Sequence, residues 1–253
     1  MVISELIGGL GNQMFQYALG RIIADNKNYN HVTNNIESLS QYFTNISNIT
    51  DRITTTDNTI IAGYGSSTNF IQHVDIQSLL DHNGGIYLKG FFQKHYLYSK
   101  YRSKLQELFK FTYDKSKPGD NDIVVHIRLG DYVQLNHYLS PSVYLDIINK
   151  LEYDNCIIIT DDPNNEFIKS FLSLRNCHIM CNSTFDDFAF INNAKRAIIS
   201  QSTFSWWATF LGNQDQVYVP LYTSHNGYPW KLNPGIDDID LIPTCDKYIK
   251  IPI

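Results

Sequence analysis

The sequence lacks a strong excess of charge of either sign. Its 253 residues include 20 Lys and Arg against 25 Asp and Glu, which gives a formal net charge of −5. A protein that binds nucleic acid through a broad basic field needs the opposite balance, so the composition argues against that class. An anionic ligand would have to be bound by a local cluster of cations or of backbone N–H groups.

Cysteine and long apolar runs are also scarce. The four cysteines include one C-x3-C pair, Cys177 and Cys181, and no C-x2-C pair, so we expect reduced thiols and no metal site. No apolar run approaches the ~18 residues of a membrane-spanning helix. The first residues lack both the basic and the apolar region of a secretory signal, which predicts a cytoplasmic protein, with peripheral membrane association left open.

The C-terminal half shows short apolar runs that alternate with stretches of helical spacing. The strand-like runs are Ile123–Ile127, Cys156–Thr160, His178–Cys181, Ala197–Ser200 and Val217–Val219. The helical stretches are Val143–Leu151, Glu166–Leu174, Phe185–Ala194 and Phe204–Leu211. This alternation predicts βαβ units and a parallel sheet that binds ligands at the carboxyl ends of its strands.

The N-terminal half begins in the same style and then becomes polar. The predicted elements are a strand at Val2–Ile7, a helix at Asn12–Asp25, strands near Thr54–Ala62 and at Gly85–Phe92, and a helix at Tyr98–Phe111. The polar segment 113–122 contains Pro and Gly and is typical of a linker. We therefore expect α/β domains at residues 1–115 and 120–240, followed by a tail at 241–253.

An arginine follows the first apolar run of the C-terminal half, in the segment HIRLGDY at residues 126–132. A guanidinium at a strand end can hold a diphosphate through two parallel hydrogen bonds. If the strand continues, His126 and Arg128 project to the same side. The segment is thus a candidate diphosphate site, and the alternative is a surface ion pair between Arg128 and Asp131.

A hydroxyl-rich segment, SQSTFSWW at residues 200–207, lies between a strand-like run and a helical stretch. The start of a helix presents unpaired N–H groups and the positive end of its dipole, and both suit a phosphate. Ser and Thr hydroxyls would add further donors. The alternative is ordinary N-capping of the helix by Ser202 or Thr203.

Two adjacent carboxylates, Asp161 and Asp162, follow the run Cys156–Thr160. A carboxylate there can accept a hydrogen bond from a ribose hydroxyl or a guanine N–H. Adjacent residues of an extended chain point to opposite faces, so the pair is poorly suited to chelating one ion. The alternative is a cap or a first-turn acid for the next helix.

A glycine-rich turn, GGLG at residues 8–11, closes the first predicted strand. It begins like a dinucleotide-binding fingerprint, but Met14 stands where the third glycine belongs and no terminal acid follows a clear second strand. The nicotinamide-dependent oxidoreductase interpretation therefore fails. What remains is a tight turn that lets the backbone approach another group closely, with Asn12 and Gln13 presenting amides.

Taken together, five segments resemble the α-1,2-fucosyltransferases in the order in which that family carries them. They are GGLGNQMFQYALGR at 8–21, GFFQKHYL at 90–97, HIRLGDYV at 126–133, ITDDP at 159–163 and SQSTFSWWATFLG at 200–212. They span most of the chain. The combination is highly specific, although no single segment is.

The resemblance implies a GT-B-like fold of two facing Rossmann-like domains with parallel sheets. It also implies a metal-independent, inverting transferase that moves fucose from GDP-β-L-fucose to the 2-hydroxyl of a galactoside. The N-terminal domain would be the acceptor side and the C-terminal domain the GDP-sugar side. The partners would be the GDP-sugar donor and an oligosaccharide or glycan acceptor.

Site roles follow from the resemblance residue by residue. Arg128 would neutralise the β-phosphate, Asn12 would face the sugar or the acceptor, and we add Asp131 as a candidate base. The donor-binding set would be Gly11, His126, Arg128, Asp161, Ser202, Thr203, Phe204 and Ser205.

Two departures from the family pattern bear on these expectations. Leu129 stands where many members carry a second arginine, which could weaken phosphate neutralisation, and the chain is short, with residues 26–84 the place for altered acceptor contacts. The alternatives kept open are a transferase of the same fold with another nucleotide sugar and a sugar-nucleotide-binding protein without turnover.

Overall fold

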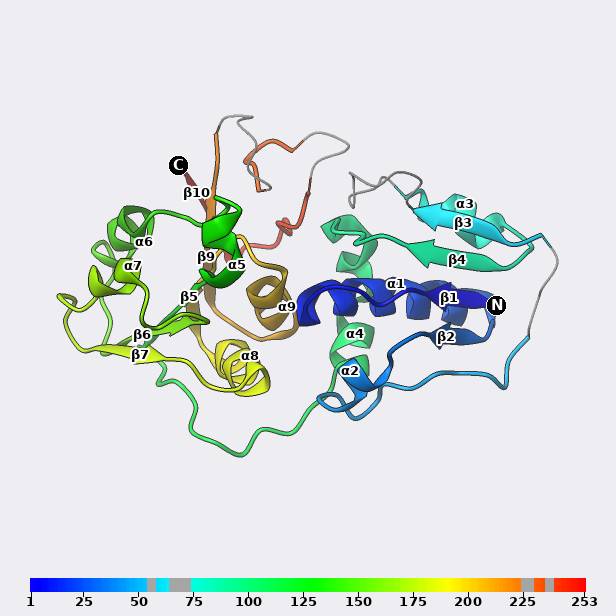
Figure 1. The fold of residues 1–253 in the computed structure, drawn as a ribbon, viewed down its shortest axis with the longest axis horizontal. Coiled ribbons are helices and arrows are strands. Elements are labelled where there is room, and N and C mark those ends of the chain that lie inside the picture. The colour runs from blue at the N-terminus through cyan, green and yellow to red at the C-terminus, as the bar shows by residue number, and fades with distance from the viewer. Residues whose placement is uncertain (54–57, 64–73, 224–229, 235–238) are drawn as a thin grey trace. The chain divides into compact units, whose positions relative to one another are not determined.

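The chain forms two α/β units, each built around its own parallel sheet. The computed structural model describes residues 1–53, 58–63, 74–223, 230–234 and 239–253. Unit 1 comprises Met1–Thr112 and Pro234–Pro243, and unit 2 comprises Tyr113–Asn233 and Thr244–Ile253. Figure 1 shows the elements of each unit, and those of unit 1 from β1 to α4 run from blue to green. The α/β class with two parallel sheets, expected from the sequence, is confirmed.

Unit 2 carries a six-stranded parallel sheet in the order β10-β9-β8-β5-β6-β7. The strands are β5 (Ile123–Ile127), β6 (Cys156–Thr160), β7 (Cys177–Met180), β8 (Arg196–Ile198), β9 (Gln216–Leu221) and β10 (Tyr248–Pro252). Numbered within the unit, this is the 3-2-1-4-5-6 order of doubly wound nucleotide-binding sheets. The order reverses between β5 and β8, so a crevice is expected at the carboxyl ends of those two strands.

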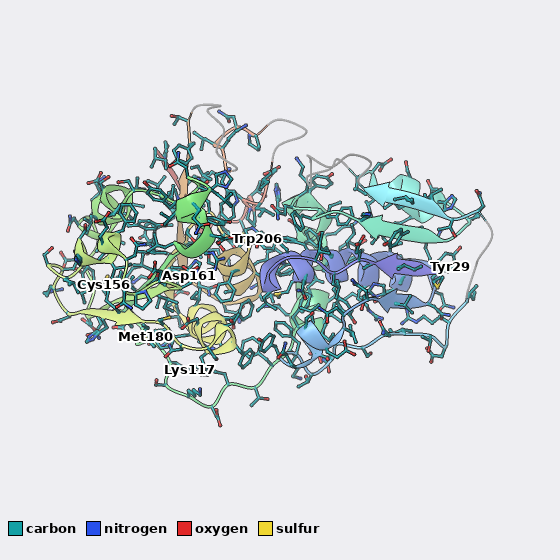
Figure 2. The ribbon with its side chains drawn as sticks, viewed as in Figure 1. Tyr29, Lys117, Cys156, Asp161, Met180 and Trp206 are labelled. Carbon is teal, nitrogen blue, oxygen red and sulfur yellow. The ribbon has the colours of Figure 1, made fainter. Side chains whose placement is uncertain are left out.

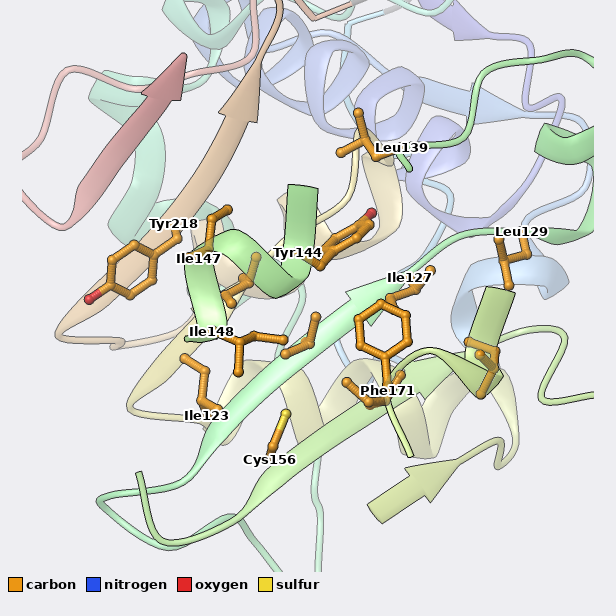
Figure 3. Close-up of a cluster of buried hydrophobic side chains, with 14 residues drawn as sticks. Ile123, Ile127, Leu129, Leu139, Tyr144, Ile147, Ile148, Cys156, Phe171 and Tyr218 are labelled. Carbon is orange, nitrogen blue, oxygen red and sulfur yellow. The ribbon is translucent and has the colours of Figure 1, made fainter. Parts of the chain in front are cut away.

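Alternate residues of β5 divide between two faces of the sheet. Ile123, Val125 and Ile127 lie in one buried cluster with side chains of α6 and with Phe171 (Figure 3). His126 lies on the other face, where its ring is 5.4 Å from that of Phe204 in α9. Both faces are therefore covered, which explains why every residue of β5 is apolar or hydrogen-bonded.

Four helices of unit 2 correspond to predicted stretches with shifted ends, and a further helix, α5 (Gly130–Gln134), was not predicted. The four are α6 (Pro141–Ile148), α7 (Glu166–Lys169), α8 (Thr184–Asn193) and α9 (Thr203–Leu211). The helix predicted at Glu166–Leu174 ends early, at Lys169. Its extension contains serines, and Ser173 donates to the Ser170 carbonyl oxygen at 3.4 Å, so side chains compete there for backbone groups.

Unit 1 carries a four-stranded parallel sheet in the order β2-β1-β4-β3. The strands are β1 (Val2–Ser4), β2 (His31–Thr33), β3 (Ile60–Gly63) and β4 (Ile86–Lys89). The helices are α1 (Leu10–Lys27), α2 (Glu37–Ser40), α3 (Ile76–Asp81), η1 (His95–Leu97), η2 (Ser99–Tyr101) and α4 (Arg102–Leu108). Part of the strand predicted near Thr54–Ala62 appears as β3, and residues 54–57 lie outside the described residues.

The start of α1 corrects the predicted glycine turn. The backbone N–H groups of Asn12 and Gln13 both donate to the Gly9 carbonyl oxygen, at 3.0 and 3.1 Å, so the helix already begins at Leu10. Gly11 and Asn12 therefore lie in its first turn. The turn itself is Gly8 and Gly9, and Gly8 adopts φ +80°, a conformation that favours glycine.

The C-terminal residues correct a second expectation, that of a tail at 241–253. Residues 248–252 form β10, which pairs in parallel with β9 in the register Tyr248 to Val217. Tyr248 is buried, whereas Lys250 and Pro252 are exposed. An exposed lysine and proline are typical of an edge strand, where they discourage further pairing. Among the described residues, no helix is both long and apolar enough to cross a membrane.

A buried polar pair fixes α1 on the sheet of unit 1. The Ser4 hydroxyl lies 3.0 Å from His31 Nε2, and both residues are fully buried. Gly20 of α1 packs directly on this pair, because a Cβ there would lie 2.2 Å from both Ser4 Oγ and His31 Nε2. The helix can approach the two strands this closely only without a side chain at position 20.

Gly20→Ala should therefore destabilise the protein. The added methyl must displace backbone or break the buried Ser4–His31 hydrogen bond, which we expect to cost about 2–4 kcal/mol of unfolding free energy. The matched control is Gly9→Ala, because a Cβ there meets nothing within 4 Å. Urea unfolding of both variants checks this, and equal stabilities would contradict the packing argument.

Candidate functional site

The polar segments singled out in the sequence meet at the strand reversal in unit 2. Arg128 follows β5 and Ser200–Ser202 follow β8, and these two strands are paired in parallel through Val125 and Ile198. Asp161 follows β6, the neighbour of β5 on the other side (Figure 2). Parallel pairing therefore brings the expected arginine, carboxylate and hydroxyl groups to one edge of the sheet.

The guanidinium of Arg128 is held between two carboxylates. Its Nη2 lies 2.5 Å from Asp131 Oδ1, and its Nη1 lies 2.7 Å from Asp161 Oδ2. Its Cζ lies 5.6 Å from the centre of the Tyr132 ring. The side chain is 35% exposed, so it remains accessible from solvent. The ion pair between Arg128 and Asp131, considered as an alternative to the functional interpretation, is thus present.

Asp161 binds both the Arg128 side chain and the backbone next to it. Its Oδ1 accepts the Leu129 N–H at 2.8 Å. It is neither a cap nor a first-turn acid, because α7 is capped by Asn165, whose side chain accepts the Phe167 N–H. Asp162 turns to that cap, with its Oδ2 3.0 Å from Asn165 Nδ2. The two adjacent carboxylates therefore serve different partners, as the alternation of an extended chain predicts.

Leu129 belongs to the core and not to the polar edge. It is 1% exposed and packs in the same buried cluster as Ile127 and Leu139 (Figure 3). The leucine that departs from the family pattern therefore contributes to the core of this chain.

His126 lies inside β5, two residues before Arg128, and is buried. Its Nδ1 lies 2.8 Å from Ser200 Oγ, which joins β5 to the end of β8. Burial, assisted by the charge of Arg128, lowers the pKa of His126 to about 3. The ring is therefore neutral at physiological pH. The imidazole hydrogen-bonds with Ser200 and packs against the Phe204 ring.

The N-terminus of α9 combines a helix cap with further hydroxyl groups. Ser202 is the N-cap, and its Oγ accepts the Phe204 N–H at 3.3 Å. Ser205 is fully buried, and its hydroxyl donates to the Ser202 carbonyl oxygen at 3.3 Å. Thr203 and Phe204 are partly exposed. The capping alternative is thus correct for Ser202, Ser205 is a structural hydroxyl, and Thr203 and Phe204 are the members of this segment open to solvent.

A buried carboxylate near the same edge was missed in the sequence. Asp187, in the first turn of α8, is 8% exposed and accepts hydrogen bonds from the Asn182 backbone and side-chain amides at 3.3 and 3.0 Å. Burial raises its pKa. Burial, together with the charges of Asp187, Asp161 and Asp162, raises the pKa of Cys181. The sequence signal was the acidic pair that follows the Ser183 cap.

In unit 1, two of the resembling segments meet at the carboxyl ends of β1 and β4. Gln93 Nε2 donates to Asn12 Oδ1 at 3.0 Å, and Gln93 is 5% exposed. Beside it, His95 Nδ1 lies 3.2 Å from Asp240 Oδ1. No sequence signal could have joined these last two residues, which are 145 positions apart. Gly11 is buried in α1.

Within the described residues, no group of three or more His, Cys, Asp or Glu side chains is placed to hold a metal ion. The expected donor-binding residues of unit 2 do lie along one edge of its sheet. The remaining expected residues, Gly11 and Asn12, lie in unit 1.

Comparison with known proteins places the chain among glycosyltransferases. Residues 1–229 match the model of glycosyl transferase family 11. An α-1,2-colitosyltransferase of Escherichia coli is 25% identical, and the match covers 99% of each chain. The O-antigen biosynthesis glycosyltransferase WbnK of Escherichia coli is 24% identical over 85% of this chain and 92% of its own. A NodZ α-1,6-fucosyltransferase structure, soaked with GDP-fucose, matches with a TM-score of 0.41 and 12% identity, covering 85% of this chain and 93% of that one.

The buried, neutral state of His126 predicts a loss of stability in acid. Its pKa is about 3 when folded and 6.5 in the unfolded chain, so the unfolded state binds the proton first as pH falls below 6.5. Stability should therefore rise with pH across that window. Between pH 5 and pH 7 this residue alone should account for about 2 kcal/mol.

His126→Asn removes the titrating ring and keeps a partner for Ser200. The variant should show about 2 kcal/mol less change in unfolding free energy between pH 5 and pH 7 than the unmodified protein. Urea unfolding at the two pH values measures this. An unchanged pH dependence would contradict the assigned ionisation of His126.

Proposed function

The chain belongs to glycosyl transferase family 11, and we propose that it transfers L-fucose from GDP-β-L-fucose to the 2-hydroxyl of a galactoside, with inversion. Membership of the family implies a sugar-nucleotide donor and a glycan acceptor. The observation that carries the proposal is the position of Arg128, which follows β5 at the strand reversal of a sheet with the strand order of nucleotide-binding folds. The N-terminus of α9 follows β8, the strand paired with β5.

The donor diphosphate would bind at this edge of unit 2. The Arg128 guanidinium can donate two parallel hydrogen bonds to phosphate oxygens and keeps its charge at any working pH. The dipole of α9 and the partly exposed Thr203 would add to the binding of the anion. The hydrogen-bonded pair of His126 and Ser200 would support the floor of the site, and we expect transfer without a metal ion.

Transfer then consists of displacing GDP from the anomeric carbon. The bond between that carbon and the β-phosphate oxygen breaks while the acceptor oxygen attacks the opposite face, which inverts the configuration. Negative charge develops on the departing phosphate, and a cation held in place by Asp161 stabilises it without reorganisation. The acceptor hydroxyl must lose its proton, and Asp131 is our candidate base.

Acceptor recognition is assigned to unit 1. Asn12 and Gln93 lie in two segments that resemble the fucosyltransferases, and their amides are joined by a hydrogen bond at the carboxyl ends of β1 and β4. Paired amides present both donors and acceptors, which suits sugar hydroxyls.

A second donor is favoured by one comparison. The similar protein of Escherichia coli whose match covers 99% of this chain is named a colitosyltransferase. Colitose is fucose without its 3-hydroxyl, so GDP-colitose presents the same diphosphate and nucleoside to the enzyme. We therefore propose GDP-colitose as the alternative donor for the same reaction.

A donor panel tests the proposed function. GDP-fucose, GDP-colitose, GDP-mannose and UDP-galactose are each incubated with β-galactoside acceptors and EDTA, and nucleotide release and product linkage are measured. We expect GDP release with one of the first two donors and an α-1,2 linkage by NMR. Release from UDP-galactose alone would overturn the donor assignment, and GDP binding without release from any GDP-sugar would favour a binding protein without turnover.

Arg128→Ala should abolish transfer while the protein remains folded. We expect kcat to fall well beyond tenfold, which corresponds to more than ~1.4 kcal/mol of transition-state stabilisation. The matched control is Arg175→Ala, which removes a guanidinium from the opposite, amino-terminal edge of the sheet, just before β7. A variant at position 128 that keeps more than a tenth of the activity would refute the role of Arg128.

A further inference from the structure

The two carboxylates on Arg128 differ in how they are fixed. Asp161 binds the Arg128 guanidinium through one oxygen and the Leu129 N–H through the other. Asp131 touches the guanidinium through one oxygen, at 2.5 Å, and its side chain is 57% exposed against 28% for Asp161. A half-exposed ion pair between residues three apart contributes little stability, so it exchanges readily.

Two residues after Arg128 allow the close approach of Asp161 to the end of β5. Leu129, whose N–H Asp161 accepts, is packed in the buried cluster. At Gly130 an added Cβ would lie 2.5 Å from Asp161 Oδ2, the same oxygen that binds Arg128. The close approach of the carboxylate to the strand end therefore depends on glycine at position 130.

The charge balance of the cluster opposes binding of an anion. One guanidinium and two carboxylates carry a net charge of −1. A diphosphate needs the outward donors of Arg128, and Asp131 occupies Nη2. The anion can bind well only if Asp131 leaves, since like charges at this distance repel.

We propose that Asp161 is a positioning residue that permanently orients Arg128, and that Asp131 is a placeholder carboxylate that the donor diphosphate displaces. This inference rests on the proposed function of the same edge. Displacement also frees Asp131 from its ion pair at the moment when the donor is bound. A base that becomes available only with the donor in place would make donor binding precede proton removal from the acceptor.

GDP binding, measured by calorimetry on the full chain without acceptor, tests the two roles separately. Asp131→Asn removes the competing charge and should tighten GDP binding by about twofold to fivefold. Asp161→Asn keeps an oxygen for the Leu129 N–H but loses the charged contact with Arg128. It should weaken GDP binding by about tenfold or more.

A double-mutant cycle shows whether Asp161 acts through Arg128. In an Arg128→Ala background, Asp161→Asn should no longer weaken GDP binding, with any loss below about twofold. A merely structural role would weaken binding equally in both backgrounds. Gly130→Ala tests the same role without changing any charge, because the added methyl displaces the Asp161 carboxylate. This variant should also weaken GDP binding only when Arg128 is present.

The outcomes separate the two proposals. If the unmodified protein does not bind GDP, the proposed function fails. If it binds GDP but Asp131→Asn leaves affinity unchanged or weakens it, the placeholder role is overturned. Equal losses from Asp161→Asn with and without Arg128 would overturn the positioning role. Should Asp161→Asn fail to fold, equal losses from Gly130→Ala with and without Arg128 would overturn that role instead.

Discussion

Parallel strand pairing is the constraint on which the site depends. Because every strand of unit 2 runs in the same direction, all the carboxyl ends meet at one edge of the sheet. The central strands β5 and β6 are buried along their whole length, so the charged residues that follow them lie at their ends. This arrangement brings Arg128 beside Asp161 and His126 beside Ser200, although these residues are distant in sequence.

The alternation of side chains along residues 127–129 also determines the direction of the Arg128 side chain. Ile127 and Leu129 lie in the buried cluster, which leaves Arg128 to point to the other side of the chain. The hydrophobic contacts of Leu129 therefore hold the backbone that Asp161 then binds. The packing of Leu129 and the ion pair of Asp161 with Arg128 act on the same segment. A change in either contact would move the Arg128 guanidinium.

Continuous apolar runs in the sequence predicted the strands that such runs form. The bounds of β5 and β6 were predicted to the residue because both are continuous apolar runs between polar turns. β10 was missed because its alternation is weak and its partner, β9, is set by long-range pairing. The ion pair of Asp161 with Arg128 was missed for a related reason, since the register that places Asp161 beside Arg128 is a property of the assembled sheet.

The functional and structural interpretations of a motif proved compatible in several places. The ion pair of Arg128 with Asp131 and the cap at Ser202 were each posed as alternatives to a ligand site, and both exist. A helix start has four N–H groups without helical partners, so a cap that satisfies one of them leaves others for a ligand. A pattern that explains local stability therefore does not count against function at a strand end.

The residues proposed to bind the diphosphate would not distinguish the sugar attached to it. Under the proposed function, Arg128 and the start of α9 would present the same donors to GDP-fucose and to GDP-colitose. The two sugars differ by one hydroxyl, and an enzyme rejects the deoxy sugar strongly only if a buried polar group is left unpaired by it. Selection of the donor therefore requires a polar side chain directed at the 3-hydroxyl, separate from the phosphate-binding edge.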